Sequence, residues 1–403
     1  MKLNRAYRYE LKPNQSQRIL LAKHAGTARF AYNWALAQRI ELYEKEKKST
    51  NAIEQHKLLN SLKATQFPWM YEVSKCSPQE ALRDLDKAFK NFFRGLKLKQ
   101  PVGFPKFKTK GMHDSFRLTG TIKIHNKEIQ LPNLGILRLK EQSRLQGRIL
   151  SATVSREADR WYVSVAVEQH LEDPKPVLGE TIALDVGINC FAALSNCEKI
   201  VSPKPLEKKM KRLKRASKQH SKKLKGSNNR KKSALKLARQ HRQIRNIRKD
   251  FHHKFSTQLA KTKSVIVIED LDIKRMLSGK RYNRSIHDAG WGEFRRMLEY
   301  KTTWYGSKLV IAPRFFPSSK KCSSCNFLAE TMPLKIRQWS CPSCKSSHDR
   351  DINAAKNLLN YYTESSSGIY ACGDPSNGGT GNWSTSYGSL KQELTNGIFV
   401  HKL

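Results

Sequence analysis

The 403-residue chain contains 76 Lys and Arg against 34 Asp and Glu, which gives a formal net charge of +42. Because so large an excess makes a compact chain repel itself unless a polyanion neutralises it, the composition points to nucleic acid as the partner and away from acidic small molecules. The length allows two or three domains, and the sequence has neither a run of about eighteen apolar residues nor a signal peptide, which predicts an intracellular protein.

The first part of the chain is predicted to form one strand followed by helices. Residues 3–11 alternate as a strand that Pro13 and Asn14 end, and apolar residues then recur at helical spacing over residues 15–47. A second helix is expected over residues 78–96. Its apolar stripe consists of Leu82, Leu85, Phe89, Phe92 and Phe93. We expect this stripe to pack in a core and not to serve as a base-stacking platform, because apolar stripes are the usual core-facing sides of helices.

Residues 115–168 favour short strands separated by Gly, Asn or Pro turns. They are predicted to form a small twisted sheet or barrel whose outer positions are basic. Residues 3–11 are the candidate for the missing edge strand of this sheet.

Two later strands are apolar runs that each carry an acid. Asp185 lies in the first run, and Glu269 ends the second, with Asp270 and Asp272 expected to be loop acids. A carboxylate among apolar neighbours is unfavourable unless a cation or hydrogen bonds compensate for its lost hydration. Asp185 is therefore the first candidate metal ligand of the chain and Glu269 the second.

The segment between these two strands, residues 204–260, is predicted to form a highly basic helical hairpin with its turn at residues 226–229. Apolar seams on both helices indicate a packed pair, so the Lys and Arg face is expected to contact phosphates. A helix over residues 285–305 and a strand over residues 308–312 follow the second acidic strand.

Two Cys-x-x-Cys pairs lie fifteen residues apart near the end of the chain. They supply four thiolates in two tight turns, the tetrahedral sulfur set that a structural zinc prefers. The predicted Zn²⁺ ligands are Cys322, Cys325, Cys341 and Cys344. A redox dithiol and two disulfides are the alternatives, and the paired spacing argues against both. Four other cysteines are expected to be reduced and unpaired, namely Cys76, Cys190, Cys197 and Cys372.

Asp351 opens an apparent helix shortly after the last of these cysteine pairs. Alone it would be interpreted as a helix cap. With Asp185 and Glu269 it completes a set of acids of the kind that an RNase H-like fold gathers around two divalent metals, about 4 Å apart, one activating water and the other stabilising the leaving 3′ oxygen. Hard oxygen ligands suit Mg²⁺ or Mn²⁺ rather than zinc.

The sequence resembles, nearly end to end, the TnpB proteins of bacterial insertion sequences, which are relatives of the compact type V CRISPR effector nucleases. No single motif is specific, but their combination is. The motifs that carry the resemblance are ARFAYNWAL, VGFPKFKTK, LPNLGILRL, LDVGIN, VIEDLDIKRM, DAGWGEFRRMLEYKTTWYG, FFPSSKKCSSC, CPSC and HDRDINAAKN.

This resemblance implies a transposon-encoded, RNA-guided DNA endonuclease of bacteria or archaea, cytoplasmic and nucleoid-associated when bound to DNA. The guide RNA would come from the transposon end, and base pairing would read target double-stranded DNA beside a short flanking motif that the protein reads. One protein is expected per RNA. Asp185, Glu269 and Asp351 would be the catalytic residues and hold Mg²⁺ or Mn²⁺, and one structural Zn²⁺ would sit in the ribbon.

The resemblance also implies a multidomain α/β architecture. It consists of a β-barrel wedge domain (residues 1–13 and 101–178), a helical recognition lobe (14–100), an RNase H-like (RuvC) nuclease domain (179–317 and 348–363, including the basic hairpin 204–260), an inserted zinc ribbon (318–347) and a flexible tail (364–403). Asn326 stands where many members have Gly after the first cysteine pair, which should alter a turn and leave the metal unaffected.

Two other functions remain open. One is a nuclease-silent, RNA-guided DNA-binding regulator, against which the three intact acids argue. The other is a transposase that acts directly on transposon ends without a guide RNA. The positive charge agrees with all three functions and does not separate them.

Overall fold

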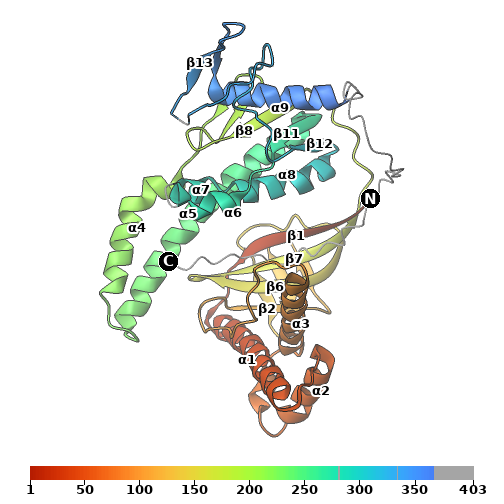
Figure 1. The fold of residues 1–403 in the computed structure, drawn as a ribbon. Coiled ribbons are helices and arrows are strands. Elements are labelled where there is room, and N and C mark those ends of the chain that lie inside the picture. Colours follow the sequence, from red (N-terminus) through yellow and green to blue (C-terminus); the bar gives the residue numbers. More distant parts are fainter. Residues whose placement is uncertain (280–281, 334, 367–403) are drawn as a thin grey trace.

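The computed structural model describes residues 1–279, 282–333 and 335–366, so the tail expected over residues 364–403 lies almost entirely outside the described residues. The chain forms two lobes (Figure 1), an N-terminal lobe coloured red to yellow and a C-terminal lobe coloured green to blue. In the described part of the chain, no helix is long and apolar enough to cross a membrane.

The helices of the N-terminal lobe are α1 (Gln15–Glu46), α2 (Ala52–Lys63), the short 3-10 helix η1 (Pro68–Glu72) and α3 (Cys76–Lys97). Helix α2 lies in an interval where no helix was predicted from apolar spacing. Its N-terminus nevertheless has a recognisable signal, because the Asn51 side chain accepts from the backbone N–H of Glu54 while Glu54 reaches back to the Asn51 backbone. A capping box identifies this helix better than its weakly amphipathic apolar pattern does.

The apolar stripe of α3 is only half core, which contradicts the prediction for its C-terminal end. Leu82 and Leu85 are fully buried against α1, as expected. Phe93 is 60% exposed, and Phe89 and Phe92 are only partly buried. The last turns of α3 are covered on the Gly95 side by the segment that follows the helix, and Phe93 is exposed on another side.

Two small antiparallel sheets complete the N-terminal lobe. The first contains, in pairing order, β1 (Lys2–Leu11), β7 (Arg160–His170), β6 (Arg148–Glu157) and β2 (Ser115–Leu118). The second contains β3 (Lys123–His125), β4 (Glu128–Leu131) and β5 (Gly135–Arg138). The expectation that residues 3–11 supply an edge strand is confirmed, because β1 pairs with β7 from Lys2 to Leu11 and has no partner on its other side within that sheet.

The sheet of the C-terminal lobe has the order β10-β9-β8-β11-β12, and β11 is parallel to both β8 and β12. Its strands are β8 (Thr181–Val186), β9 (Ala192–Leu194), β10 (Lys199–Ile200), β11 (Val265–Glu269) and β12 (Lys308–Ala312). The central strands are apolar on both faces because helices cover both. Ile182 and Ile266 face α5 (Asn228–Thr262) and α8 (Trp291–Tyr305), whereas Ala183 and Val267 face α9 (Arg350–Ser366). Figure 1 shows α9 and α8 on opposite sides of this sheet.

The basic hairpin consists of α4 (Pro205–Ser221) and α5, and it projects from the C-terminal lobe (Figure 1). Its longer helix is joined to the turn between β6 and β7 by ion pairs. Arg239 and Arg242 donate to Asp159 at 2.8 Å and 2.9 Å, and Arg245 pairs with Glu157. We call these contacts the lobe brace.

The helix predicted over residues 285–305 is two helices in the structure, α7 (Asn283–Ala289) and α8. They meet at Gly290, whose φ of 66° lies in the left-handed region. A side chain at this position would also approach Arg248 and His252 at 3.0 Å. Glycine is therefore required at the break by both backbone conformation and packing. The short helix α6 (Ile273–Ser278) precedes this pair.

Candidate functional site

Asp185 lies near the carboxyl end of β8, the central strand between β9 and β11. Burial, together with the neighbouring charges of Asp351 and Glu269, raises the pKa of its carboxyl group to about 8. Arg350 and Arg337 oppose the shift. The structure thus brings the three predicted acids into one electrostatic environment, in which Asp185 is protonated at neutral pH unless a cation is supplied.

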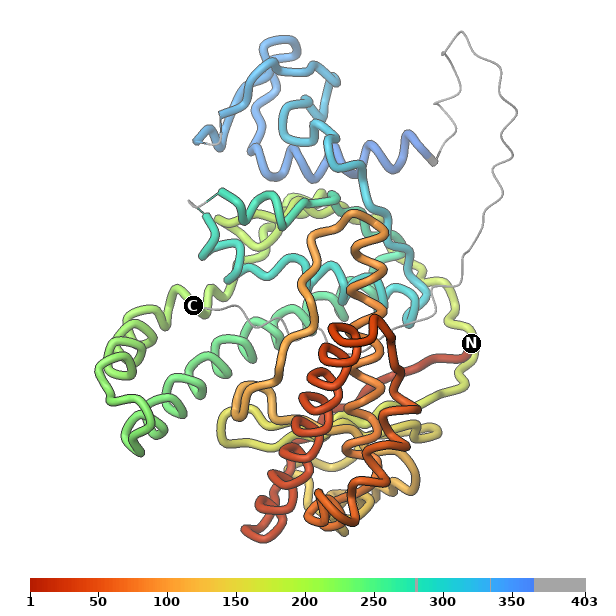
Figure 2. The backbone as a smooth tube through the Cα atoms, turned by 60° about the horizontal axis from the view of Figure 1, so that its bottom comes forward, coloured from red at the N-terminus to blue at the C-terminus, as the bar shows by residue number. Residues whose placement is uncertain are grey.

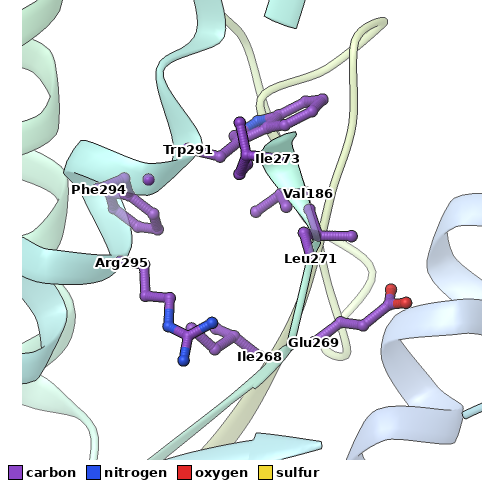
Figure 3. Close-up of a pocket in the computed structure, with 9 residues that line it drawn as sticks. Val186, Ile268, Glu269, Leu271, Ile273, Trp291, Phe294 and Arg295 are labelled. Carbon is purple, nitrogen blue, oxygen red and sulfur yellow. The ribbon is translucent and has the colours of Figure 1, made fainter. Parts of the chain in front are cut away.

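Glu269 ends β11, the parallel neighbour of β8, so both carboxylates lie at the same edge of the sheet. Figure 3 shows the Glu269 carboxylate pointing away from the apolar pocket between β11 and α8, toward the helix drawn in pale blue. That pocket has a volume of about 30 Å³, enough for roughly one water molecule. Burial raises the pKa of Glu269, with a further contribution from the charge of Asp270.

The two acids after Glu269 are loop acids, as predicted. Asp270 pairs with Arg295 and with Arg314, whose Nη2 lies 2.7 Å from the carboxylate, and these contacts lower its pKa. Asp272 accepts from the backbone N–H of Arg275 at 3.0 Å and caps α6. Both side chains are thus used for structure.

Asp351 lies in the first turn of α9, but the cap of this helix is Asp349. The Asp349 carboxylate accepts from the backbone N–H groups of Asp351 and Ile352 at 3.2 Å and 3.1 Å. Lys199 of β10 pairs with the same carboxylate at 2.7 Å. Because Asp349 satisfies the helix N-terminus, the Asp351 carboxylate is not used as a cap, and its charge acts on Asp185.

Arg337 is a site residue that the sequence did not indicate. Its Nη1 donates to the Asp351 carboxylate at 3.1 Å. With the Asn189 amide oriented so that its oxygen faces Arg337, the same guanidinium also donates to Asn189. Arg337 precedes β13 (Gln338–Ser340), so it reaches the acids from the segment between the two cysteine pairs. Only the tertiary structure brings it to Asp351, so no local pattern could have identified it.

Four cysteine sulfurs form a compact set in which all ligand atoms lie within 4.8 Å of one another. They belong to the predicted residues Cys322, Cys325, Cys341 and Cys344. Among the described residues, no second group of three or more potential ligands is as compact. The three carboxylates therefore share a field without forming a metal-sized cluster, as expected for like charges, and Asp351 pairs with Arg337 instead.

Three asparagines of α9 hold the first cysteine pair against the helix. Asn353 accepts from the backbone N–H of Ser323 at 2.9 Å and donates to the Lys321 carbonyl. Asn357 donates to the carbonyls of Ser318 and Lys321, and Asn360 donates to that of Ser323. Their spacing places them on one face of α9. The helix that carries Asp351 is thereby fixed to the cysteine cluster.

His348 adds a contact to this cluster. It lies in the strand β14 (Ser347–Asp349), which pairs with β13, and its Nε2 lies 3.1 Å from the sulfur of Cys322. Its ring also lies 5.1 Å from that of Trp339. The aromatic contact orients the imidazole toward the sulfur.

Three family models match the chain. They are described as "Probable transposase" over residues 162–279, "Cas12f1-like, TNB domain" over residues 291–358 and "Helix-turn-helix domain" over residues 1–48. The last description does not agree with the structure, because residues 1–48 form the strand β1 and the single long helix α1.

A relative from Streptomyces pristinaespiralis, named "Putative RNA-guided DNA endonuclease", is 36% identical over 97% of this chain and 96% of its own length. The chain belongs to the TnpB family. An Escherichia coli K12 member, "Putative RNA-guided DNA endonuclease InsQ", is 32% identical over 93% of this chain and 95% of its own length. The TnpB fold is also similar to that of a solved Cas12f1–sgRNA–target DNA complex, with a TM-score of 0.50 at 17% identity, covering 85% of this chain and 82% of the other.

The raised pKa of Asp185 predicts a pH dependence of stability in EDTA. Because the folded state holds this proton to about pH 8 and the unfolded state releases it near pH 3.8, the contribution of Asp185 lowers the stability of the folded state as pH rises between these values. We expect Asp185→Asn to remove this loss, so that the variant exceeds the wild type in melting temperature by a margin that grows up to about pH 8. Asp270→Asn is the control and should lower the melting temperature at neutral pH, because the substitution removes the ion pairs of Asp270 with Arg295 and Arg314. A margin for Asp185→Asn that is constant with pH would contradict the assignment.

The asparagine contacts predict a graded effect on stability. Asn357→Ala leaves two backbone carbonyls without their buried donor, which we expect to lower the free energy of unfolding by about 1–3 kcal/mol. Asn360→Ala removes one longer, partly buried bond of 3.3 Å and should have the smaller effect. Urea unfolding of both variants measures the difference. Equal losses would mean that the Asn357 bonds do not hold the cysteine pair.

Proposed function

We propose that this chain is an RNA-guided DNA endonuclease encoded by a transposable element. It would cleave double-stranded DNA that matches a guide RNA from the transposon end, beside a short flanking motif. The observation that carries the proposal is the partly buried carboxylate of Asp185, held at a sheet edge with Glu269 and Asp351 in its field. Full-length similarity to relatives that are named as RNA-guided DNA endonucleases supports it.

The donor chemistry of the acids agrees with a divalent metal site. Asp185 needs a cation to be ionised at neutral pH, and carboxylate oxygens are the ligands that Mg²⁺ and Mn²⁺ prefer. We infer that Asp185, Glu269 and Asp351 are the catalytic residues and hold these metals. When bound, such metals supply an activated water and neutralise the leaving 3′ oxygen.

Other residues of the chain arrange this site. Arg337 fixes the Asp351 carboxylate and places a positive charge where a DNA phosphate would approach. Arg295 and Arg314 pair with the Asp270 carboxylate, so Glu269 is the acid of this segment that is available as a metal ligand. The apolar floor formed by β8 and β11 excludes water from beneath the carboxylates.

The cysteine cluster agrees with a structural Zn²⁺. The four sulfurs already lie within 4.8 Å of one another, and thiolates are soft ligands that favour zinc. Because four protein ligands complete a tetrahedron, this zinc would have no open position for substrate. Cys322, Cys325, Cys341 and Cys344 are the proposed ligands.

We further propose that the domains have the boundaries and roles that the family suggests. Residues 179–317 and 348–363 would be the RuvC-like nuclease domain, with the ribbon over residues 318–347. Residues 1–13 and 101–178 would be the wedge domain that grips the guide RNA scaffold, and residues 14–100 the recognition lobe. The net charge of +42 supplies the phosphate contacts that such an assembly needs.

Guided cleavage is tested by purifying the protein from cells that carry its flanking DNA and sequencing the RNA that co-purifies. We expect a discrete RNA, and Mg²⁺-dependent cutting of DNA that matches it. Asp351→Ala should abolish cutting and leave RNA binding nearly unchanged, because the acid contributes to the metal site and not to the RNA grip. Tight target binding without cutting by the wild type would identify a regulator. Strand transfer without any bound RNA would identify a transposase.

Zinc binding is tested by Cys341→Ser. We expect the variant to lose most of its bound zinc and to unfold at lower temperature, because Cys341 is a fully buried member of the set. Metal analysis by mass spectrometry gives the zinc content. Cys197→Ser is the matched control, since Cys197 is exposed and outside the cluster. Normal zinc in Cys341→Ser would refute the ligand assignment.

A further inference from the structure

An exposed aromatic surface lies at the C-terminal end of α3 and on the segment that follows it. We call it the α3 platform, formed by Phe89, Phe92, Phe93 and Phe104, whose rings contact one another. Phe93 is 60% and Phe104 46% exposed, and Phe89 and Phe92 are half-buried. Phe93, which was predicted to belong to a core, therefore faces outward.

Ring contacts make most of the α3 platform a fixed surface. Phe104 stands edge-on to Phe89 and Phe92, with centroid separations of 5.5 Å and 5.4 Å. Phe92 also contacts Phe93 at 5.4 Å. Edge-on and tilted pairs of this kind hold aromatic rings in defined orientations.

The backbone beneath the α3 platform is held as firmly. A Cβ at Gly95 would lie 2.3 Å from Val102 Cγ1, so only glycine lets the returning segment pack this closely on α3. The Asn33 side chain makes two hydrogen bonds to the backbone of Lys108, at 2.9 Å and 2.7 Å. In Figure 2 the orange segment turns at the end of α3 and runs back beside the red helix α1.

The segment that carries the α3 platform has charged side chains of one sign. Residues 89–112 contain seven Lys and Arg and no Asp or Glu. Six of them are exposed, namely Lys90, Arg94, Lys97, Lys99, Lys106 and Lys110, whereas Lys108 is half-buried with its Nζ over the Tyr32 ring. Pairing with a second copy of this chain would juxtapose two such surfaces, which like-charge repulsion opposes. Exposed aromatic rings among cations instead match a nucleic-acid strand, whose bases stack while its phosphates meet the cations.

We propose that the α3 platform stacks on an unpaired or terminal base of a bound nucleic-acid strand, with Phe93 as the principal stacking ring and the surrounding lysines on the phosphates. The inference rests on the proposed function in one respect, namely that the chain binds nucleic acid. The base could belong to the RNA or to a DNA strand, since both present the same aromatic face.

The test measures binding of the full-length protein to four probes: a 20-nucleotide uridine RNA, a 20-nucleotide thymidine DNA, and an abasic strand of the same length for each. For Phe93→Ala we expect about ten-fold weaker binding to a base-bearing probe, within the range of one base–aromatic stack. Binding to the abasic strands and the salt dependence should be unchanged, because the phosphate contacts remain. Phe93→Trp should retain binding at the wild-type level, because it keeps an aromatic ring, and Phe93→Leu should bind as weakly as Phe93→Ala. Loss confined to one base-bearing probe assigns the base to RNA or to DNA.

Tyr43→Ala is the matched control, because Tyr43 is also 60% exposed on a helix of the same lobe but lies outside the α3 platform. A wild-type protein that binds abasic and base-bearing strands equally would overturn the proposal. So would full rescue by leucine, equal loss on abasic strands, or a wild-type dimer in sedimentation that Phe93→Ala disperses. These probes need no guide, so the two proposals can fail separately. Absence of guided cleavage together with an intact preference for base-bearing strands would refute the proposed function alone. Guided cleavage without that preference would refute only this inference.

Discussion

The placement of Asp185 is the constraint on which the C-terminal lobe depends. Its carboxyl group lies at the end of a central strand, where desolvation and two neighbouring acids raise its pKa to about 8. An ionised form at neutral pH therefore requires positive charge from outside the sheet. The parallel pairing of β8 and β11 puts Glu269 at the same edge, and α9 brings Asp351 across one face. Such an arrangement lowers the stability of the folded protein, and strongly shifted pKa values of this kind cluster at functional sites.

The cysteine cluster contributes to that site although it offers no open ligand position. Asn353 and Asn357 join the first cysteine pair to α9, and the pairing of β13 with β14 joins the second part of the ribbon to the start of the same helix. Arg337 then reaches Asp351 from this rigid unit. The ribbon thus fixes the position of one acid and of its cationic partner, which is how a closed metal site can influence chemistry at a distance.

The features that could be predicted from the sequence are those with a strong local signature. The apolar strands ending in acids, the paired cysteines and the edge strand formed by β1 all have one, and the structure brings Asp185, Glu269 and Asp351 into a single field. The features that could not be predicted depend on backbone geometry and tertiary contacts. From the sequence, Asp351 alone would be interpreted as the cap of α9, and only the backbone geometry identifies Asp349 in that role. Phe93 has the spacing of a core residue, but exposure depends on where the covering elements end. Arg337 acts through tertiary contacts alone.

The two lobes are joined by polar contacts, whereas each lobe is built around apolar clusters. The apolar clusters of the N-terminal lobe and of the C-terminal sheet are separate, so no common core of described residues spans the boundary. The lobe brace consists of Arg239, Arg242 and Arg245 on Asp159 and Glu157, and a cation–π contact of Arg5 with Trp304 at 4.2 Å adds to it. Arg239 is 53% exposed and Arg242 only 10%, so salt screens the first ion pair more than the second. Phosphate oxygens are bound by arginine in the same way as these carboxylates, so the groups that join the lobes are of the kind that a polyanion also engages.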